Sequence, residues 1–240
     1  MNTYVINMED SIHKFNIIQQ TTTLNPIRFI AKTPKDIDAN THKISPIARL
    51  FTPKIPIAIA LSHLSLIEHI FNTDTNSYAL ILEDDATPIE QGIDLQSKIR
   101  EVIDNTPNNW DIIRLHYFNV LGSAKQGYRA GKSLFSNAAY IVRRESIPFI
   151  LNKKIYYHFD MQLNHTSLNI YKSPTPLFKT DENESSTRGK LIFPYKNVKG
   201  LRSAESWMGF NALRIPFTDV EFTVELLVIT VIVVMFMVMR

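Results

Sequence analysis

The chain contains no cysteine among its 240 residues. Disulfides, thiolate zinc sites and a cysteine nucleophile are therefore excluded, and the composition fits a reducing compartment. There is no long block of Lys and Arg, and the formal net charge of +3 is mild, so no nucleic-acid partner is expected. The chain also lacks a Gly-rich phosphate loop and an Asp-x-Asp-x-Thr motif, which argues against a metal-dependent phosphohydrolase.

What the chain does have is the composition of a folded protein. Its hydrophobic content is 45% and its charged content is 20%, and its length fits one domain with a substantial core. Apolar runs predict strands at residues 4–8, 27–31, 78–82, 110–115 and 138–142, and helical spacing predicts helices at 11–20, 58–72, 92–104 and 146–153. This alternation predicts an α/β sandwich around a mostly parallel central sheet, within a domain that covers residues 1–215.

One apolar run ends abruptly in acidic residues. Residues 78–82 are typical of a strand buried on both faces, and Glu83, Asp84 and Asp85 follow directly. We expect them at the carboxyl end of that strand, where open α/β sheets place ligands. At ~5 Å and an effective dielectric of ~20, each carboxylate pair repels by roughly 3 kcal/mol, which Mg²⁺ or Mn²⁺ would offset. Such ions bridge to phosphate oxygens, which implies a nucleotide or sugar nucleotide. A solvated turn that caps the next helix also fits these residues.

Two further segments carry candidate site residues. Ser62 and His63 are expected to open the helix at 58–72, where Ser62 and the first-turn amides would hold a phosphate or a sugar hydroxyl. The alternative is an N-cap serine beside a surface histidine. Aromatic residues surround Asp160 in the segment 156–163, and desolvation there would raise its pKa toward that of a general base, with His158 as a ligand for a metal or a pyrophosphate oxygen. A satisfied polar pair at a strand end fits this segment equally well.

Taken in order, these segments resemble glycosyltransferase family 25, the group of lipopolysaccharide-biosynthesis and collagen galactosyltransferase-like enzymes. The resemblance covers roughly residues 3–190 and rests on residues 4–8, 60–63, 78–86, 110–115, 136–142, 160, 176–177 and 185–186. It implies a GT-A-like nucleotide-sugar-binding domain, a UDP-sugar donor, Mn²⁺ or Mg²⁺, and inversion at the anomeric carbon. The implied activity is galactosyltransferase-like hexosyl transfer to a hydroxyl of a glycan or protein acceptor.

The resemblance also implies catalytic and metal-binding roles. Asp85 would be the direct metal ligand, and Glu83 or Asp84 would support it or contact the ribose. The expected metal-binding set is therefore Asp85, Glu83 and His158. Asp160 would be the base that deprotonates the acceptor hydroxyl.

The donor-binding residues come from two places in the chain. By the same resemblance, the first strand would flank the uracil and ribose through Tyr4, Ile6 and Asn7. Ser62 and His63 would complete the contacts to the nucleotide sugar.

The chain departs from the family just before this Ser-His pair. Family members often carry Gly-Cys or Ala-Cys in that segment, whereas this chain has Ala58 and Ile59 there. Glycine would permit a close backbone approach that other residues do not. A catalytically weak or inactive family member that binds carbohydrate or nucleotide sugar therefore stands as the alternative function.

The C-terminal tail, residues 216–240, is strongly apolar. From residue 222 to 239 every residue is apolar or Thr except Glu225. As a helix these residues would span ~27 Å, close to the ~30 Å hydrocarbon core of a bilayer. We expect a membrane anchor, with Glu225 near the interface, Arg240 snorkelling at the far end, and the catalytic domain in the cytosol because no secretory signal is evident. A Val/Ile-rich terminal strand or helix buried against the domain is the alternative.

Overall fold

A computed structural model describes the chain except for residues 91, 93, 120–133, 181–190, 194–207 and 240. Residues 185–186, which contribute to the family resemblance, lie outside the described part.

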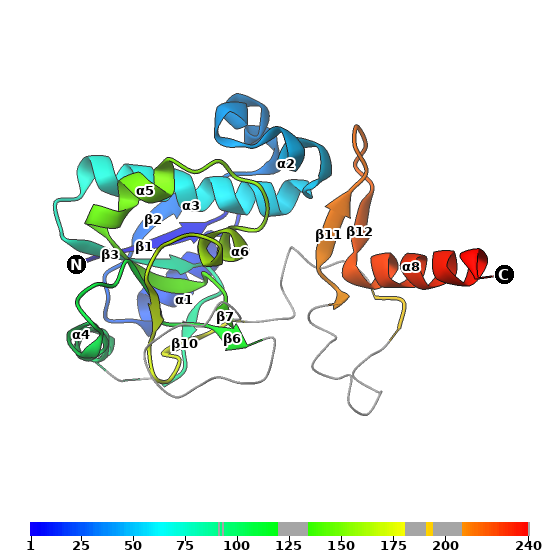
Figure 1. The fold of residues 1–240 in the computed structure, drawn as a ribbon. Helices are drawn as coiled ribbons and strands as arrows, with labels where there is room; N and C mark the ends of the chain where they lie inside the picture. The colour runs from blue at the N-terminus through cyan, green and yellow to red at the C-terminus, as the bar shows by residue number, and fades with distance from the viewer. Residues whose placement is uncertain (91, 93, 120–133, 181–190, 194–207, 240) are drawn as a thin grey trace.

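The central sheet has six strands in the order β2-β1-β3-β8-β5-β9 (Figure 1). Five of them run in one direction, and β8 runs antiparallel to its neighbours β3 and β5. The strands are β1 (Asn2–Asn7), β2 (Ile27–Ile30), β3 (Tyr78–Glu83), β5 (Ile112–Arg114), β8 (Ala139–Arg143) and β9 (Ile170–Lys172). The predicted α/β class with a mostly parallel sheet is confirmed.

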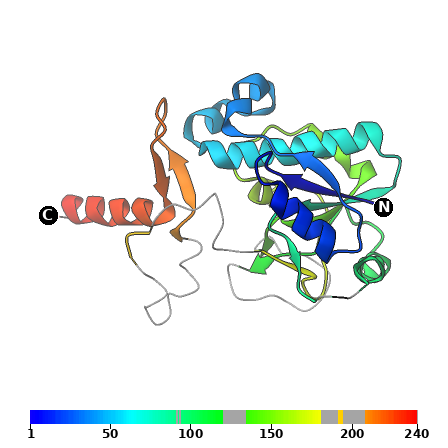
Figure 2. The same cartoon turned by 180° about the vertical axis from the view of Figure 1, so that it is seen from behind.

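Helices cover both faces of this sheet (Figures 1 and 2). They are α1 (Ile12–Thr21), α3 (Lys54–Thr73), α4 (Leu95–Asn105), α5 (Ile147–Leu151) and α6 (Phe159–Asn164). On one face α3, α5 and α6 pack against side chains such as Tyr4 and Ile81. On the other face α1 and α4 pack against Val5 and Leu82. Because both faces are covered, β3 is buried along its length without alternation, as its apolar run predicted.

The remaining elements are short and lie mostly in the connections. They are the 3-10 helices η1 (Pro34–Asp36), η2 (Asp38–Lys43) and η3 (Arg144–Ser146), the helix α2 (Pro46–Phe51), and the strands β4 (Thr87–Pro88), β6 (Phe118–Asn119), β7 (Leu134–Phe135) and β10 (Phe178–Lys179). β4 pairs with β10 and β6 pairs with β7, both antiparallel. These pairs lie beside the central sheet rather than in it.

The long helix α3 begins earlier than its apolar spacing predicted. It starts at Lys54 rather than near residue 58, and Pro56 lies in its first turn, where proline is tolerated. The backbone N–H of Lys54 donates to Glu221 Oε1 at 3.1 Å, so a residue far along the chain satisfies a free amide of the first turn. By length and composition α3 would suit a membrane span, but most of its side chains are buried in the core. It is the central core helix of the domain.

The C-terminal tail forms a hairpin followed by a helix. β11 (Asn211–Arg214) pairs antiparallel with β12 (Glu221–Thr223), and α8 (Val224–Val238) follows at once. The boundary expected between residues 215 and 216 therefore falls at the tip of this hairpin. The hairpin lies next to α2, and α8 projects away from the body that holds the sheet (Figure 1). Its side chains from Val228 onward are largely exposed, so the alternative of a tail buried against the domain is wrong for this part of α8.

Glu225, which is expected near the membrane interface, has a side chain that is fully buried within the protein. Its two carboxylate oxygens accept hydrogen bonds from the backbone N–H groups of Ile192 and Phe193, at 2.6 and 2.8 Å. The isolated acid in the apolar tail therefore fastens the start of α8 to a preceding loop, which the sequence pattern gave no means of seeing.

Candidate functional site

The acidic residues lie at the carboxyl edge of the sheet, where β1 and β3 end side by side. Ile6 pairs in register with Glu83, so Asn7 lies next to the acidic turn. The buried Asn7 side chain donates from Nδ2 to Asp84 Oδ2 at 2.8 Å and accepts from Arg28 Nε at 2.7 Å. Asp84 is thereby held against the end of β1. The acidic cluster is part of an organised edge and not a freely solvated turn.

Tyr4 and Ile6, expected beside the uracil and ribose, do not lie in this edge. Both side chains are buried in the core layer beneath α3. The Tyr4 hydroxyl donates to Asp74 Oδ2 at 3.1 Å, and Asp74 ends α3 just before the amino end of β3. The expected donor contacts of these two side chains are wrong because strand alternation points them into the core. Asn7 is the residue of β1 whose side chain reaches the acidic edge.

His63 connects α3 to the acidic edge. Its ring is buried, with Nε2 3.1 Å from Glu83 Oε1 and Nδ1 3.0 Å from the Tyr140 hydroxyl. Phe159 stacks on the ring with centroids 5.0 Å apart. Burial raises the pKa of the Tyr140 hydroxyl, and Glu83 raises it further, so Tyr140 keeps its proton to donate to Nδ1. With Nδ1 accepting from Tyr140, the Nε2–H of the ring donates to Glu83 Oε1 and holds that carboxylate in place.

Ser62 lies well inside α3 and does not open it. Its hydroxyl donates to the Ala58 carbonyl at 2.9 Å and accepts from the Lys32 backbone N–H at 2.7 Å. The expected phosphate contact at a helix N-terminus is therefore wrong, since the interior amides of α3 are used within the helix. Ser62 ties the segment after β2 to α3. Ala58 and Ile59 also lie within α3, so the departure from the family falls in a helix and not in a donor loop.

Asp85 is the least satisfied of the three acids. Its Oδ1 is buried and has no hydrogen-bond partner among the residues that the structure describes. Burial raises the pKa of the Asp85 carboxyl to about 7, and the charges of Glu83 and Asp84 add to the effect. An unpartnered buried carboxylate is costly to ionise, and a cation placed against it would remove that cost.

Asp160 lies in the first turn of α6, next to residues from the ends of β5 and β8. Arg114, at the end of β5, donates from Nη2 to the Asp160 carbonyl at 3.3 Å. Asn137, with its amide oriented to satisfy both partners, accepts from the Asp160 backbone N–H at 3.1 Å. Phe159, the preceding residue, stacks on His63. Asp160 is thus held close to the network that holds Glu83, although the two segments are far apart in sequence.

His158 is set among aromatic rings rather than among carboxylates of the acidic turn. Its ring centroid lies 4.6 Å from that of Tyr157 and 5.7 Å from that of Phe210. Burial lowers the pKa of His158, and the charge of Asp160 partly offsets this. His158 is therefore close to the candidate base, Asp160. It lies in a group of aromatic side chains that extends to Phe210, just before β11.

The expected metal-binding set of Asp85, Glu83 and His158 is not assembled. Within the described residues, no three side chains of His, Cys, Asp or Glu converge as a metal-binding group. The physical reason is that Glu83 is held by His63 and His158 is packed between aromatic rings. The unpartnered Asp85 oxygen nevertheless fits a divalent cation, since Mg²⁺ in nucleotide sites often takes only one or two carboxylates and fills its shell with phosphate oxygens and water. Asp85, with Glu83 or Asp84 beside it, would hold such an ion.

No protein-family model and no curated protein sequence matches the chain. Among solved structures, A197 from STIV is similar, with a TM-score of 0.39 and 12% identity over 80% of this chain and 100% of that one. Mouse xyloside xylosyltransferase 1 is similar with a TM-score of 0.36 and 11% identity over 68% of this chain and 67% of that one. A Drosophila β-1,4-galactosyltransferase 7 in complex with manganese, UDP-Gal and xylobiose has a TM-score of 0.35 and 8% identity, over 80% and 77% of the two chains.

Two of these three similar structures are glycosyltransferases by name. At such TM-scores and identities the likeness carries no argument about chemistry, and membership of glycosyltransferase family 25 stays a prediction.

Two buried charged residues on strands near the site were not expected from the sequence. Arg114 and Lys172 are both buried charged residues on the neighbouring strands β5 and β9. Burial lowers the pKa of Arg114 to about 10, while the charge of Asp160 opposes that shift. The signal that was present is a lone Arg in the apolar run at residues 110–115, because a buried arginine requires partners.

The raised pKa of Asp85 predicts a pH-dependent stability. Between pH 4 and 7 the folded protein keeps a proton that the unfolded chain has lost, so stability falls as pH rises through this window and levels off above it. The difference between about 7 and an ordinary aspartate pKa corresponds to roughly 4 kcal/mol. We expect thermal melts without divalent cations to show this loss, and Asp85→Asn to remove most of it.

The matched control is Asp104→Asn, which changes an exposed carboxylate on α4 and is expected to keep the wild-type pH slope. Mn²⁺ at pH 8 should restore stability to the wild type and not to Asp85→Asn. Equal pH slopes in the wild type and Asp85→Asn would contradict the assignment.

Proposed function

We propose that the chain is a metal-dependent inverting glycosyltransferase that moves a sugar from a UDP-sugar to a hydroxyl of a glycan or protein acceptor. The observation that carries the proposal is the buried, unpartnered Asp85 oxygen at the carboxyl edge of the central strand β3. Ligands of open α/β sheets bind at this edge. Three adjacent carboxylates there disfavour an anionic ligand by itself and favour one that arrives with a divalent cation.

The proposed division of labour follows from the positions of the chain's own residues. Asp85 is the group that would hold the cation, whose charge would stabilise the UDP leaving group. Asn7 and His63 fix Asp84 and Glu83 from two sides, so the acidic edge keeps its shape when a donor binds. Asn7 also lies at the end of β1, where the nucleoside is expected.

Asp160 is the proposed general base on the opposite side of the edge. Its backbone is held at both ends, by Asn137 and by Arg114, so its carboxylate has a defined position. In the proposed step, Asp160 takes the proton of the acceptor hydroxyl as that oxygen bonds to the anomeric carbon. The bond from the anomeric carbon to the UDP oxygen breaks on the other face, which gives inversion.

We also propose that α8 places this domain on a membrane. The helix is apolar on all sides, carries its single acid in the first turn, and exposes most of its side chains. A helix that is hydrophobic all round is normally buried in protein or lipid. Its 15 residues span ~22 Å, less than the ~30 Å hydrocarbon core, so the proposal is insertion and not a complete crossing by this helix.

The test of the enzymatic proposal is UDP release from a panel of UDP-sugars. Purified protein is expected to release UDP from at least one of them with Mn²⁺ or Mg²⁺, and to stop when a chelator is added. Calorimetric binding of a UDP-sugar without turnover on any acceptor would favour the alternative of a nucleotide-sugar-binding protein. Neither binding nor turnover across the panel would overturn both.

A further inference from the structure

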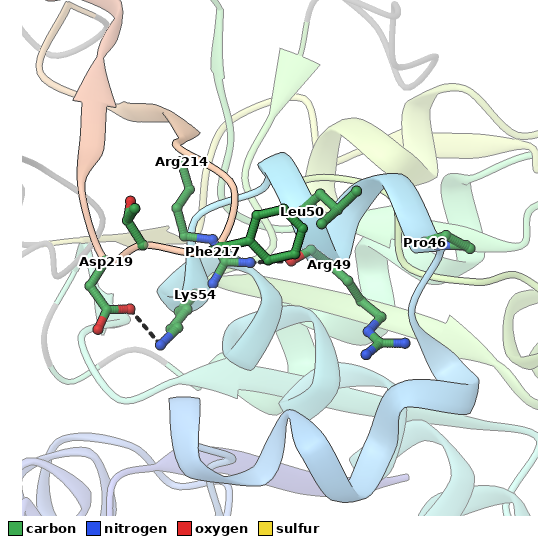
Figure 3. Close-up of a pocket in the computed structure, with 8 residues that line it drawn as sticks. Pro46, Arg49, Leu50, Lys54, Arg214, Phe217 and Asp219 are labelled. Atoms are coloured by element: carbon green, nitrogen blue, oxygen red, sulfur yellow. Dashed lines mark hydrogen bonds and ion pairs between the residues drawn. The ribbon is translucent and has the colours of Figure 1, made fainter.

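A cavity lies away from the acidic edge, between α2, the start of α3 and the β11–β12 hairpin (Figure 3). Its volume is about 590 Å³. Three cationic side chains line it, namely Arg49, Lys54 and Arg214, with Asp219 as the single lining carboxylate. Asp219 is paired with Lys54 Nζ at 2.5 Å. The lining therefore keeps an excess of two positive charges.

Arg214 is the unusual member of this set. Only 8% of its surface is exposed, and Figure 3 shows its guanidinium directed into the cavity. One Nη2–H donates to the Arg49 carbonyl, whereas Nε is buried without a partner among the described residues. Glu221, its register partner on β12, directs its carboxylate to the Lys54 N–H and to Asn211 instead. A buried guanidinium with an open donor is suited to an oxyanion, and phosphate matches its planar donors best.

The rim of the cavity is apolar. Phe217 lines it and is 95% exposed, at φ 64. A non-glycine residue in this left-handed region is strained. The hairpin tip therefore exposes the phenyl ring at a cost in conformational energy. Ile215 and Val220 flank it and are also exposed. The apolar helix α8 leaves from the same hairpin.

The strand that carries Arg214 also contacts the segment just before Asp160. The Tyr157 hydroxyl donates to the Ala212 carbonyl of β11 at 3.1 Å, and Phe210 contacts His158 just before that strand. β11 then runs from Asn211 to Arg214, a length of ~10 Å for an extended strand.

The geometry points to this cavity as a binding site for the phosphate headgroup of a membrane lipid. The Arg214 guanidinium takes the phosphate oxygens, the charge of Arg49 adds to the positive field of the cavity, and Phe217 remains with the apolar part of the lipid. The positive charge of the cavity favours a phosphate as the ligand. The exposed apolar tip of the hairpin beside α8 favours the phosphate of a lipid over free inorganic phosphate. The assignment does not rest on the proposed sugar transfer, since it concerns different residues and a binding measurement.

The experiment uses the full chain in an uncharged detergent, titrated calorimetrically with dihexanoyl phosphatidic acid. Binding is expected, with much weaker binding of dihexanoyl phosphatidylcholine and of inorganic phosphate. Arg214→Gln is expected to weaken phosphatidic acid binding about tenfold or more, as loss of charged hydrogen bonds does. Because Arg214 is buried, the exposed Arg49→Gln is the second variant, with a smaller loss in the same direction. Lys98→Gln, an equal change of charge on α4, is the matched control.

Phe217→Ser tests the contact with the apolar part of the lipid separately from the contact with its phosphate headgroup. It is expected to weaken phosphatidic acid binding and to leave any inorganic phosphate binding unchanged. Equal affinity for inorganic phosphate and phosphatidic acid would overturn the lipid assignment in favour of a free phosphate site. Equal binding of the two lipids, or equal losses in Arg214→Gln, Arg49→Gln and Lys98→Gln, would overturn the headgroup site altogether.

Discussion

Asp85→Ala is expected to lower Mn²⁺-dependent UDP release by about 10³-fold or more, while the protein stays folded. The two effects have one cause. One oxygen of the Asp85 carboxylate, Oδ1, is buried without a partner among the described residues, and Glu83 and Asp84 lie close to the group, so its ionised form destabilises the protein unless a cation binds. Removal of the side chain should therefore leave the melting temperature at pH 8 unchanged or raised, while the proposed cation site is lost.

The measurement pairs initial rates of UDP release with thermal melts at pH 8, for the wild type, Asp85→Ala and the surface control Asp104→Ala. The control is expected to match the wild type in both. An unchanged rate in Asp85→Ala would show that the cation, if one is used, is held elsewhere. A large fall in melting temperature would show instead that Asp85 stabilises the fold, contrary to its raised pKa.

Truncation after Glu225 is expected to move the protein from the membrane pellet to the supernatant. The deleted part of α8 is apolar and mostly exposed, so few contacts to the body are lost with it. Glu225 must be kept because its carboxylate accepts the backbone hydrogen bonds of Ile192 and Phe193. The expected readouts are complete release on fractionation, the same melting temperature as the parent in detergent, and unchanged UDP release.

A cut after Pro216 serves as the contrasting variant. It removes β12 together with α8, and with it the contacts of Glu221 and Asp219 to Lys54. This variant is expected to be destabilised, whereas the cut after Glu225 is not. Aggregation of both truncated forms would mean that α8 packs against protein, and would remove the basis for the membrane proposal.

The sequence predicted the sheet well because the central strands carry a local signal. The central residues of β1, β3 and β8 are apolar, and strands covered on both faces need no other pattern. The strands β9 and β11 were missed because they are short and only partly buried. Their positions depend on pairing with β5 and β12, which no local pattern reports.

The candidate site was predictable only in part, for a similar reason. The acidic turn at the end of β3 follows from a local run, and its position at the carboxyl edge was expected. The predicted roles of Ser62 and Tyr4 were wrong for different reasons. The role of Ser62 depended on where α3 begins, and because α3 begins at Lys54, Ser62 lies in the helix interior. The role of Tyr4 depended on which face of β1 its side chain takes. The link from His63 to Glu83 and Tyr140 depends on three elements meeting, and sequence spacing does not contain that information.

The start of α3 is where the hairpin is fastened, through Glu221 and the Lys54 N–H. His63, which grips Glu83 of the acidic edge, lies on the same helix, ~14 Å further along at the rise of an α-helix. α3 thus joins the hairpin rigidly to the acidic edge. If α8 places the domain on a membrane as proposed, the height of the acidic edge above the bilayer would be set by a core helix and not by a flexible stalk, which would fix its reach toward an acceptor.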